Sequence, residues 1–395
     1  MREIYADNAA TTAVSPHVLE AMTPYFGEFF GNPSSLHSFG RKAAAAMDDA
    51  RKTIASYLGC DPRELYFTSS GTEADNWAVV NAVRLGAKKG KKHLITTAFE
   101  HHALLHTMEQ MEKQGCEVTW LDVHEDGVIR MDELEQAIRP DTALVSIMYA
   151  NNEIGTIQPI PEIGKLCREK GVLFHTDAVQ AAGHLPIDVE KLCIDMLSIS
   201  AHKFHGPKGI GMLYCRRTVA LSNLLYGGGQ ERGKRPGTES PAMVVGMATA
   251  FKDACDAMEA DMPKVAVLRD KLIAGLSVIP RSRLNGHPTK RLPGNVNFAF
   301  EGIEGESLLL NLDMKGIAAS SGSACTSGSL DPSHVLLSIG LPHEVAHGSL
   351  RLSLSHYTTE EDVDYIIQEV PPIVAYLREI SPVWERIMKE EQVPV

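Results

Sequence analysis

The chain has 395 residues, which is long for one hydrophobic core, so we expect two domains that share an interface. Its 44% hydrophobic and 22% charged residues are typical of a globular protein. No apolar run approaches the roughly 20 residues that a membrane-spanning helix needs, so we expect neither a membrane protein nor a disordered one. The net charge of −12 opposes attraction to phosphate backbones, so nucleic acid is not an expected partner.

Targeting and cysteine signals point to a cytoplasmic protein. Residues 1–7 lack the basic and then apolar order of a signal peptide. The seven cysteines are an odd number whose smallest spacing is 22 residues, which favours neither a disulfide framework nor a CxxC metal site. Six of them lie in apolar or helical stretches and are expected to be buried: Cys60, Cys116, Cys167, Cys193, Cys215 and Cys255.

Short apolar runs alternate with amphipathic segments between residues 15 and 260. The apolar runs predict buried strands over residues 65–68, 93–97, 118–121, 143–148, 172–176 and 196–200. Helical spacing is found between most of them, over residues 73–85, 103–113 and 161–170. This alternation predicts an α/β fold with a mostly parallel sheet covered by helices on both faces. Ligands of such sheets bind at the carboxyl ends of the strands.

The pattern changes after residue 261. A helix is predicted over residues 265–276, and an alternating segment over residues 349–354 predicts a half-exposed strand. We therefore predict a large domain over residues 15–260. Residues 1–14 and 261–395 would form a smaller α+β domain.

Lys203 lies just after the predicted strand 196–200, between His202 and His205. A desolvated lysine amine at such a strand end can bond covalently to a carbonyl cofactor. An ordinary surface lysine is the alternative. Lys208 competes for the same role, but it lies in a Gly-Pro-Lys-Gly turn.

Asp177 follows the strand that ends at Thr176, and it lies 26 residues before Lys203. That spacing is one crossover unit, so both residues can emerge at the same edge of neighbouring strands. Such a pair suits pyridoxal phosphate (PLP), because the acid keeps the pyridine nitrogen protonated while the lysine bonds to the aldehyde carbon. A simple helix N-cap is the alternative for Asp177.

Residues 69–74, with the sequence SSGTEA, lie between a predicted strand and a helix. Free N–H groups and the helix dipole favour an anion such as a phosphate there, although an ordinary capping box explains the sequence equally well. Residues 228–234 match the GxxxxGK pattern of a nucleotide P-loop. Arg235 follows in place of the required Ser or Thr, so a P-loop is not expected.

Seven motifs in chain order resemble the NifS/IscS-type cysteine desulfurases over nearly the whole chain. They are the stretches 7–12 (DNAATT), 31–37 (GNPSSLH), 70–73 (SGTE), 151–155 (NNEIG), 177–180 (DAVQ), 200–203 (SAHK) and 321–327 (SGSACTS). The resemblance implies a fold-type I PLP enzyme that removes sulfur from L-cysteine and leaves L-alanine and an enzyme persulfide.

The resemblance also implies roles for individual residues. Lys203 would hold PLP, Asp177 would pair with its ring nitrogen, Gln180 would bond its 3′-oxygen, and His101 would stack on the ring and assist proton transfer. His102 adjoins His101, and only the family pattern chooses between them.

Further roles concern the phosphate and the substrate. The phosphate would be held by Gly71, Thr72, Ser200, His202 and Thr238, the last supplied by the other subunit of a homodimer. Asn152 would lie near the 3′-oxygen and the substrate, and Arg351 would bind the substrate carboxylate, as planar arginine does well.

Cys325 matches the thiol that this chemistry requires, because a nucleophile must collect the substrate's sulfur. Five of the ten residues 320–329 are Ser and two are Gly, which is typical of a mobile loop. An incidental cysteine in a linker is the alternative. The resemblance implies that Cys325 carries a persulfide to an acceptor protein, such as an iron–sulfur scaffold.

Other functions fit parts of this pattern. A selenocysteine lyase or an aminotransferase could share the scaffold, and a sulfur-relay subunit could dock partners without catalysis. His101, His102 and His106 have helical spacing, but Glu100 is the only acid that directly adjoins them in the sequence, so no metal site is expected.

Overall fold

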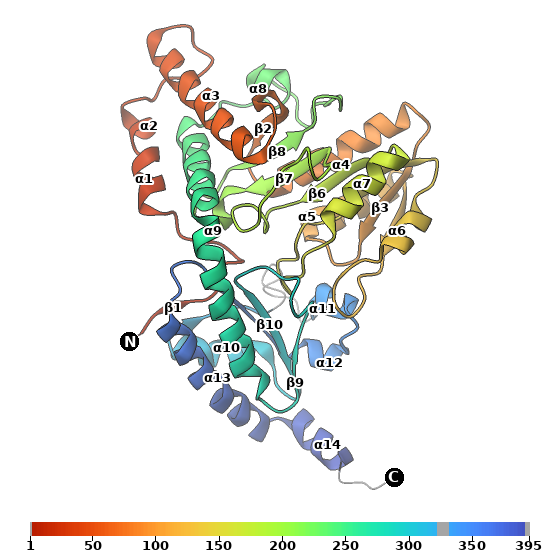
Figure 1. Ribbon diagram of the computed structural model, residues 1–395, viewed down its shortest axis with the longest axis vertical. Coiled ribbons are helices and arrows are strands. Elements are labelled where there is room, and N and C mark those ends of the chain that lie inside the picture. The colour runs from red at the N-terminus through yellow and green to blue at the C-terminus, as the bar shows by residue number, and fades with distance from the viewer. Residues whose placement is uncertain (1, 322–331, 392–395) are drawn as a thin grey trace.

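The computed structural model describes residues 2–321 and 332–391, so Cys325 lies outside the described residues. Its main feature is a seven-stranded sheet (Figure 1). In spatial order the strands are β2 (Leu65–Thr68), β8 (Gly211–Cys215), β7 (Met196–Ser200), β6 (Leu173–Asp177), β5 (Thr142–Ser146), β3 (His93–Thr97) and β4 (Glu117–Leu121). Only β8 pairs antiparallel to its neighbours, so the predicted mostly parallel sheet is confirmed.

Helices cover both faces of this sheet, as the strand residues show. Along β5, Leu144 packs in a core with α4 (Gly71–Ala87) and α5 (His102–Lys113), whereas Val145 packs in the core of the opposite face. The strands are apolar on both sides because both faces are covered. The opposite face is covered by α3 (Ser38–Leu58), α7 (Ile160–Lys170) and the first half of α9 (Pro241–Ser277).

The cores on the two faces of the large sheet are taken together as the first core. A second core lies around a three-stranded sheet in the order β12 (Ser349–Ser353), β10 (Asn295–Phe300), β9 (Ser282–Leu284). It includes residues of α10 (Gly305–Met314) and α13 (Glu360–Glu379). The start of the chain belongs to this core, because Ile4 is buried there and β1 (Ile4–Tyr5) pairs with β11 (Ile317–Ala318).

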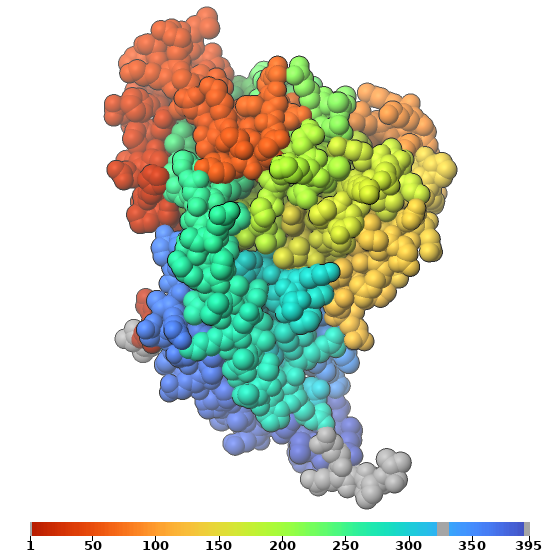
Figure 2. Space-filling model, viewed as in Figure 1, coloured from red at the N-terminus to blue at the C-terminus, as the bar shows by residue number. Residues whose placement is uncertain are grey.

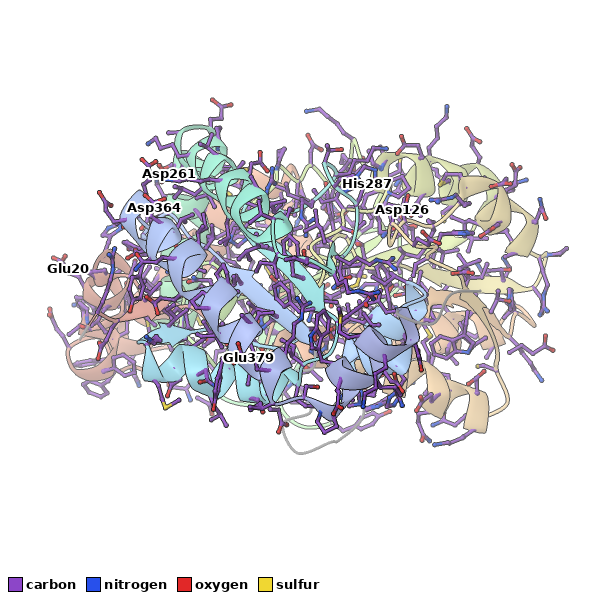
Figure 3. All side chains as sticks on the ribbon, turned by 90° about the horizontal axis from the view of Figure 1, so that it is seen from below. Glu20, Asp126, Asp261, His287, Asp364 and Glu379 are labelled. Carbon is purple, nitrogen blue, oxygen red and sulfur yellow. The ribbon has the colours of Figure 1, made fainter. Side chains whose placement is uncertain are left out.

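Helix α9 joins the two cores. Phe251 packs in the first core and Leu272 in the second, and the helix passes through Pro263 between them. In Figure 2 its surface runs from the upper part of the molecule into the lower part. A loop contact also joins the two parts, since Thr156 Oγ1 donates to Asp126 O and accepts from His287 N. Figure 3 labels Asp126 and His287, the two residues that this contact brings together.

The remaining helices are shorter or peripheral. They are α1 (Pro16–Met22), α2 (Pro24–Gly27), η1 (Pro62–Glu64), α6 (Met131–Ala137), η2 (Ala201–Lys203), α8 (Gln230–Gly233), α11 (His334–Ser338), α12 (His343–Ala346) and α14 (Pro382–Glu391). Within the described ranges, no helix combines the length and apolarity that crossing a bilayer requires.

Two sequence predictions about burial were wrong. Strand β12 is buried along its whole length, not half exposed, because its polar residues contact the N-terminal segment: Ser353 Oγ accepts from Ala9 N. Of the six cysteines expected to be buried, only Cys167 and Cys215 are; the other four, Cys60, Cys116, Cys193 and Cys255, are partly exposed. Apolar neighbours in sequence do not decide how deeply one side chain of a surface helix or turn lies.

Candidate active site

A cavity of about 310 Å³ opens at the carboxyl ends of the parallel strands β6 and β7. It brings together ten residues that the sequence singled out: Gly71, Thr72, His101, Asn152, Asp177, Gln180, Ser200, His202, Lys203 and Arg351. These residues come from segments that are far apart in the chain, and their roles stay predictions.

Lys203 ends the short helix η2, directly after β7, and its side chain lines the cavity. Its ammonium group donates to two backbone carbonyls of the N-terminal segment, Ala9 O at 2.7 Å and Ala10 O at 2.8 Å. The competing Lys208 is exposed and is not among the described residues that line the cavity. The geometry therefore favours Lys203 as the amine that meets a bound cofactor.

Asp177 is the last residue of β6, and its register partner on β7 is Ser198. The carboxylate is 5% exposed and accepts a hydrogen bond from Val179 N at 2.8 Å, so it also caps the turn that follows. Burial raises its pKa above the usual value, while the charge of Lys203 acts in the opposite direction. A cationic ring nitrogen would stabilise the ionised form of this buried acid.

Gln180 also lines the cavity, next to the N-terminal segment. Its amide donates to Ala9 O at 3.0 Å, the carbonyl that also accepts from Lys203. The N-terminal segment therefore fixes two of the predicted cofactor residues at once.

Asp75 also lines the cavity, and sequence reasoning did not identify it. It is 1% exposed, and its Oδ1 has no hydrogen-bond partner among the described residues. Burial and the nearby charge of Asp177 hold its pKa well above the usual value, which favours the protonated form. The signal was present, because Asp75 follows Gly71 by four residues and so lies on the same face of α4.

The N-terminus of α4 forms one end of the cavity. Gly71 is its first residue, and the first-turn N–H groups of a helix have no partners within the helix. Ser70 accepts from Glu73 N, so the segment is a helix cap as well as a potential anion site. A Cβ atom on Gly71 would lie 2.8 Å from Val179 Cγ2, so only glycine keeps this approach open.

Ser200 and His202 also line the cavity, and a Cβ atom on Gly71 would lie 3.4 Å from Ser200 Cβ. His202 Nδ1 lies 3.1 Å from Thr11 Oγ1, and burial, with the charge of Lys203, lowers the pKa of its imidazole to about 4. His202 is therefore neutral at pH 7. A neutral imidazole can donate one hydrogen bond to a phosphate oxygen without adding charge.

His101 is the N-cap of α5, and its Nδ1 accepts from Ala103 N at 3.1 Å. Burial, followed by the charge of Lys203, lowers the pKa of this imidazole to about 4. The neutral ring therefore carries its proton on Nε2. His102 packs instead against His334, with ring centroids 4.7 Å apart, and is not among the described lining residues.

Arg351, on β12, is 2% exposed. Its Nη2 donates to Asp7 Oδ1 at 2.8 Å, and its Nη1 donates to Asn152 O at 3.2 Å. Nε is buried and has no hydrogen-bond partner within the described part of the chain. Arg351 lines the cavity, so its guanidinium group lies at the cavity wall with one donor that no described residue accepts from.

Two predicted residues are not placed in this cavity. Thr238 is exposed and does not belong to the described lining residues. Cys325 lies outside the described residues. Within residues 2–321 and 332–391, no group of three or more His, Cys, Asp or Glu side chains is arranged to hold a metal ion.

The donors and acceptors of the cavity fit PLP. Lys203 can hold the aldehyde carbon, Asp177 the ring nitrogen and Gln180 a ring oxygen, while the glycine-opened start of α4 can take the phosphate. A mostly parallel α/β fold with a cavity of this composition is typical of the PLP-dependent enzymes related to aminotransferases.

Comparison with known proteins identifies the family within this class. A family model described as Aminotransferase class-V matches residues 4–366. The cysteine desulfurase IscS of Clostridium botulinum (strain Hall) is 54% identical over 394 residues, 99% of each chain. That of Methanosarcina thermophila is 55% identical, covering 96% of this chain and 94% of the relative. A solved NifS-like protein has a TM-score of 0.90 at 39% identity, covering 95% of this chain and 100% of that one. The chain belongs to the class-V aminotransferase family, which confirms the predicted resemblance and fold class.

Proposed function

We propose that this chain is a cysteine desulfurase, which removes sulfur from L-cysteine, releases L-alanine and passes the sulfur to acceptor proteins. The predicted activity and the use of PLP are confirmed by the family and by relatives of that name at 54% and 55% identity over nearly the whole chain. One observation carries the residue assignment that we add: Lys203, Asp177 and Arg351 line the same cavity.

Each side chain has a task that its environment supports. When bound, PLP withdraws electrons from the substrate's Cα, which makes the bond between Cβ and sulfur easier to break. Asp177 supplies the buried negative charge that pairs with the cofactor's ring nitrogen. Arg351 binds the substrate carboxylate, and His101, neutral with its proton on Nε2, can exchange a proton with the substrate.

We assign the transfer of sulfur to Cys325. Its thiolate attacks the substrate's sulfur, the bond between that sulfur and Cβ breaks, and a persulfide forms on Cys325. Two protons, one from each thiol, complete the alanine product and the persulfide, so cysteine and a thiol give alanine and a persulfide without an external oxidant. The Ser- and Gly-rich sequence of residues 320–329 supports a thiol that can move between cavity and acceptor.

The assembly and the division of the chain are further parts of the proposal. Thr238 is exposed, which suits a residue that completes the phosphate site of a second copy in a homodimer. An iron–sulfur scaffold is the acceptor that the relatives' name supports best. The two separate cores support a large domain over residues 15–260 and a small one formed by residues 1–14 and 261–395. A cytoplasmic location stays a prediction.

The test of the assigned thiol combines activity with mass. After incubation with L-cysteine, the intact mass of the wild-type chain should increase by one sulfur on Cys325. The Cys325→Ser variant should keep the absorbance of bound PLP but form no alanine, whereas Lys203→Ala should lose that absorbance. Cys255→Ser is the matched control, because it removes another partly exposed thiol and should leave activity unchanged.

Other outcomes would identify a different function. Full alanine formation by Cys325→Ser would remove Cys325 from its assigned role. A keto acid in place of alanine would identify an aminotransferase, and a strong preference for selenocysteine would identify a selenocysteine lyase. A colourless protein that cannot be reconstituted with PLP would favour a docking subunit.

A further inference from the structure

The N-terminal segment that accepts from Lys203 is itself fixed to strand β12. Ser353 N donates to Ala6 O at 2.7 Å, Asn8 Nδ2 donates to Ser353 O at 2.8 Å, and Ala9 N donates to Ser353 Oγ at 2.8 Å. Asp7 lies between these anchored residues. Its backbone is therefore held beside the strand that carries Arg351, two residues before Ser353.

The side chain of Asp7 uses this placement to hold Arg351 at one point. Asp7 Oδ1 accepts a hydrogen bond from Arg351 Nη2 at 2.8 Å. The other terminal nitrogen, Arg351 Nη1, donates to the backbone carbonyl of Asn152. Neither contact involves Nε, whose N–H is buried without a partner among the described residues. A buried donor without an acceptor is costly, and a guanidinium group is well suited to bind a carboxylate through two parallel N–H groups.

We propose that Asp7 is a positioning residue, which orients the Arg351 guanidinium so that its Nε side stays available for the α-carboxylate of an amino acid substrate. The inference rests on the proposed function, because it assumes that Arg351 binds the substrate. It goes beyond that function by assigning the selection of α-amino acids over simple amines to Arg351 and Asp7 together, although the family resemblance implies no role for Asp7.

A countercharge is needed at this position because Arg351 is almost fully buried. Among the described residues, Glu153 is a second carboxyl group close enough to feel the charge of Arg351, and it accepts from Ser333 Oγ. Burial raises the pKa of Glu153 to about 7, so only part of its population is charged at neutral pH. Asp7 is hydrogen-bonded to the guanidinium directly. The opposite possibility is that Asp7 competes with the substrate for Arg351, and the experiment separates the two.

The experiment measures equilibrium binding of two amines to the holoenzyme through the change in cofactor absorbance. L-Alanine carries the α-carboxylate, and ethylamine is the same molecule without it. The Asp7→Ala variant should bind L-alanine about tenfold more weakly, which corresponds to about 1.4 kcal/mol, and ethylamine as the wild type does. Asp7→Asn keeps an acceptor oxygen for Nη2, so its loss for L-alanine should be smaller.

Two comparisons make the result specific. In an Arg351→Ala background, Asp7→Ala should cause no further loss of L-alanine binding, because the two residues act as a unit. Glu344→Ala removes a carboxylate from an exposed pair with Arg386 and is the matched control, with no expected change. In steady-state assays, Asp7→Ala should raise KM for L-cysteine about tenfold and change kcat less than twofold.

Three results would overturn the proposal. Tighter L-alanine binding by Asp7→Ala would show competition in place of positioning. An equal loss for ethylamine would show that Asp7 only maintains the Lys203 contacts, and an unchanged affinity in both Asp7 variants would show that Arg351 is oriented without it. Because L-alanine binding requires no turnover, a wild-type protein that releases no sulfur would refute the proposed function while the test of Asp7 still gives an answer.

Discussion

Burial sets the protonation of several acids around the cavity. Glu100 is fully buried, and its Oε1 accepts from Thr97 Oγ1 and Met148 N. Burial, with the nearby charge of Asp177, raises its pKa to about 8. Glu100 is therefore mostly protonated at neutral pH, and it contributes little negative charge next to the acid that is proposed to pair with the cofactor.

The raised pKa of Glu100 predicts how stability changes with pH. Between its ordinary value of 4.5 and about 8, the folded state binds more protons than the unfolded state, so the free energy of unfolding falls as pH rises. Glu100→Gln keeps the acceptor oxygen and removes the titration. From pH 5 to pH 8 the wild type should lose about 3 kcal/mol more than this variant in urea unfolding. Parallel pH profiles of the two proteins would contradict the assignment.

At the scale of single residues, the sequence predicted those site residues that directly follow the end of an apolar strand. Lys203 and Asp177 each follow an apolar strand, so their shared edge could be worked out before the fold was seen. Ala9 and Ala10 could not be found this way, because they act through backbone carbonyls that every residue possesses. Asp7 was part of a motif, but its contact with Arg351 joins positions 344 residues apart.

At the scale of elements, the junction between β2 and α4 determines how closely an anion can approach the helix N-terminus. Gly71 faces Val179, which comes from the turn after β6. The ends of two strands that are not adjacent in the sheet, β2 and β6, therefore define the space in front of the helix, and its width depends on one missing side chain.

This geometry predicts that Gly71→Ala weakens cofactor binding. The new methyl group would lie 2.8 Å from Val179 Cγ2, so one of the two must move into the space of the phosphate. The affinity of the apoprotein for PLP, measured by titration, should fall about tenfold, on the order of 1.4 kcal/mol. Val179→Ala in the same chain should restore most of it.

Control variants distinguish this local effect from a general one. Gly27→Ala is matched, because no atom lies within 4 Å of the added Cβ and PLP affinity should not change. Val179→Ala alone should also bind PLP normally. If the double variant binds as weakly as Gly71→Ala, contact with Val179 is not the cause.

Most elements of the central sheet were predictable because buried strands and amphipathic helices leave different periodicities. Strand β8 was missed, although it is a short apolar run like the others. Its antiparallel direction is determined by how it pairs with β2 and β7, and its own residues give no sign of that direction. The prediction that β12 is half exposed was wrong for a related reason. Alternating polar residues give the same sequence pattern whether water or another segment of the protein covers them.

At the scale of the whole molecule, two cores share helix α9, and the cavity residues come from both of them. Arg351 is on the sheet of the second core, whereas Lys203 and Asp177 follow strands of the first. Relative movement of the two parts would change the distance between the carboxylate site and the lysine. Neither core contains a complete site on its own.

The proposed homodimer gives a prediction that no single chain can fulfil. The test combines two variants, Thr238→Ala with an intact Lys203 and Lys203→Ala with an intact Thr238. If Thr238 completes the partner's phosphate site, a dimer of one chain of each kind has one site with both native residues. Random mixing of the two variants should then give about a quarter of the sites with wild-type PLP affinity, measured as alanine formation at limiting PLP. Activity that never exceeds the average of the separate variants would place Thr238 in its own chain's site or in none.

The position of the N-terminal segment has a consequence for translation of the message. The next methionine after the first is Met22, in α1. A polypeptide started there would keep every strand of the large sheet and also Lys203, Asp177 and Arg351. It would lack both carbonyls that accept from Lys203, the carboxylate that holds Arg351 and the strand that pairs with β11. Initiation at the second methionine would thus yield a protein of almost full length in which the lysine and the arginine have each lost these partners.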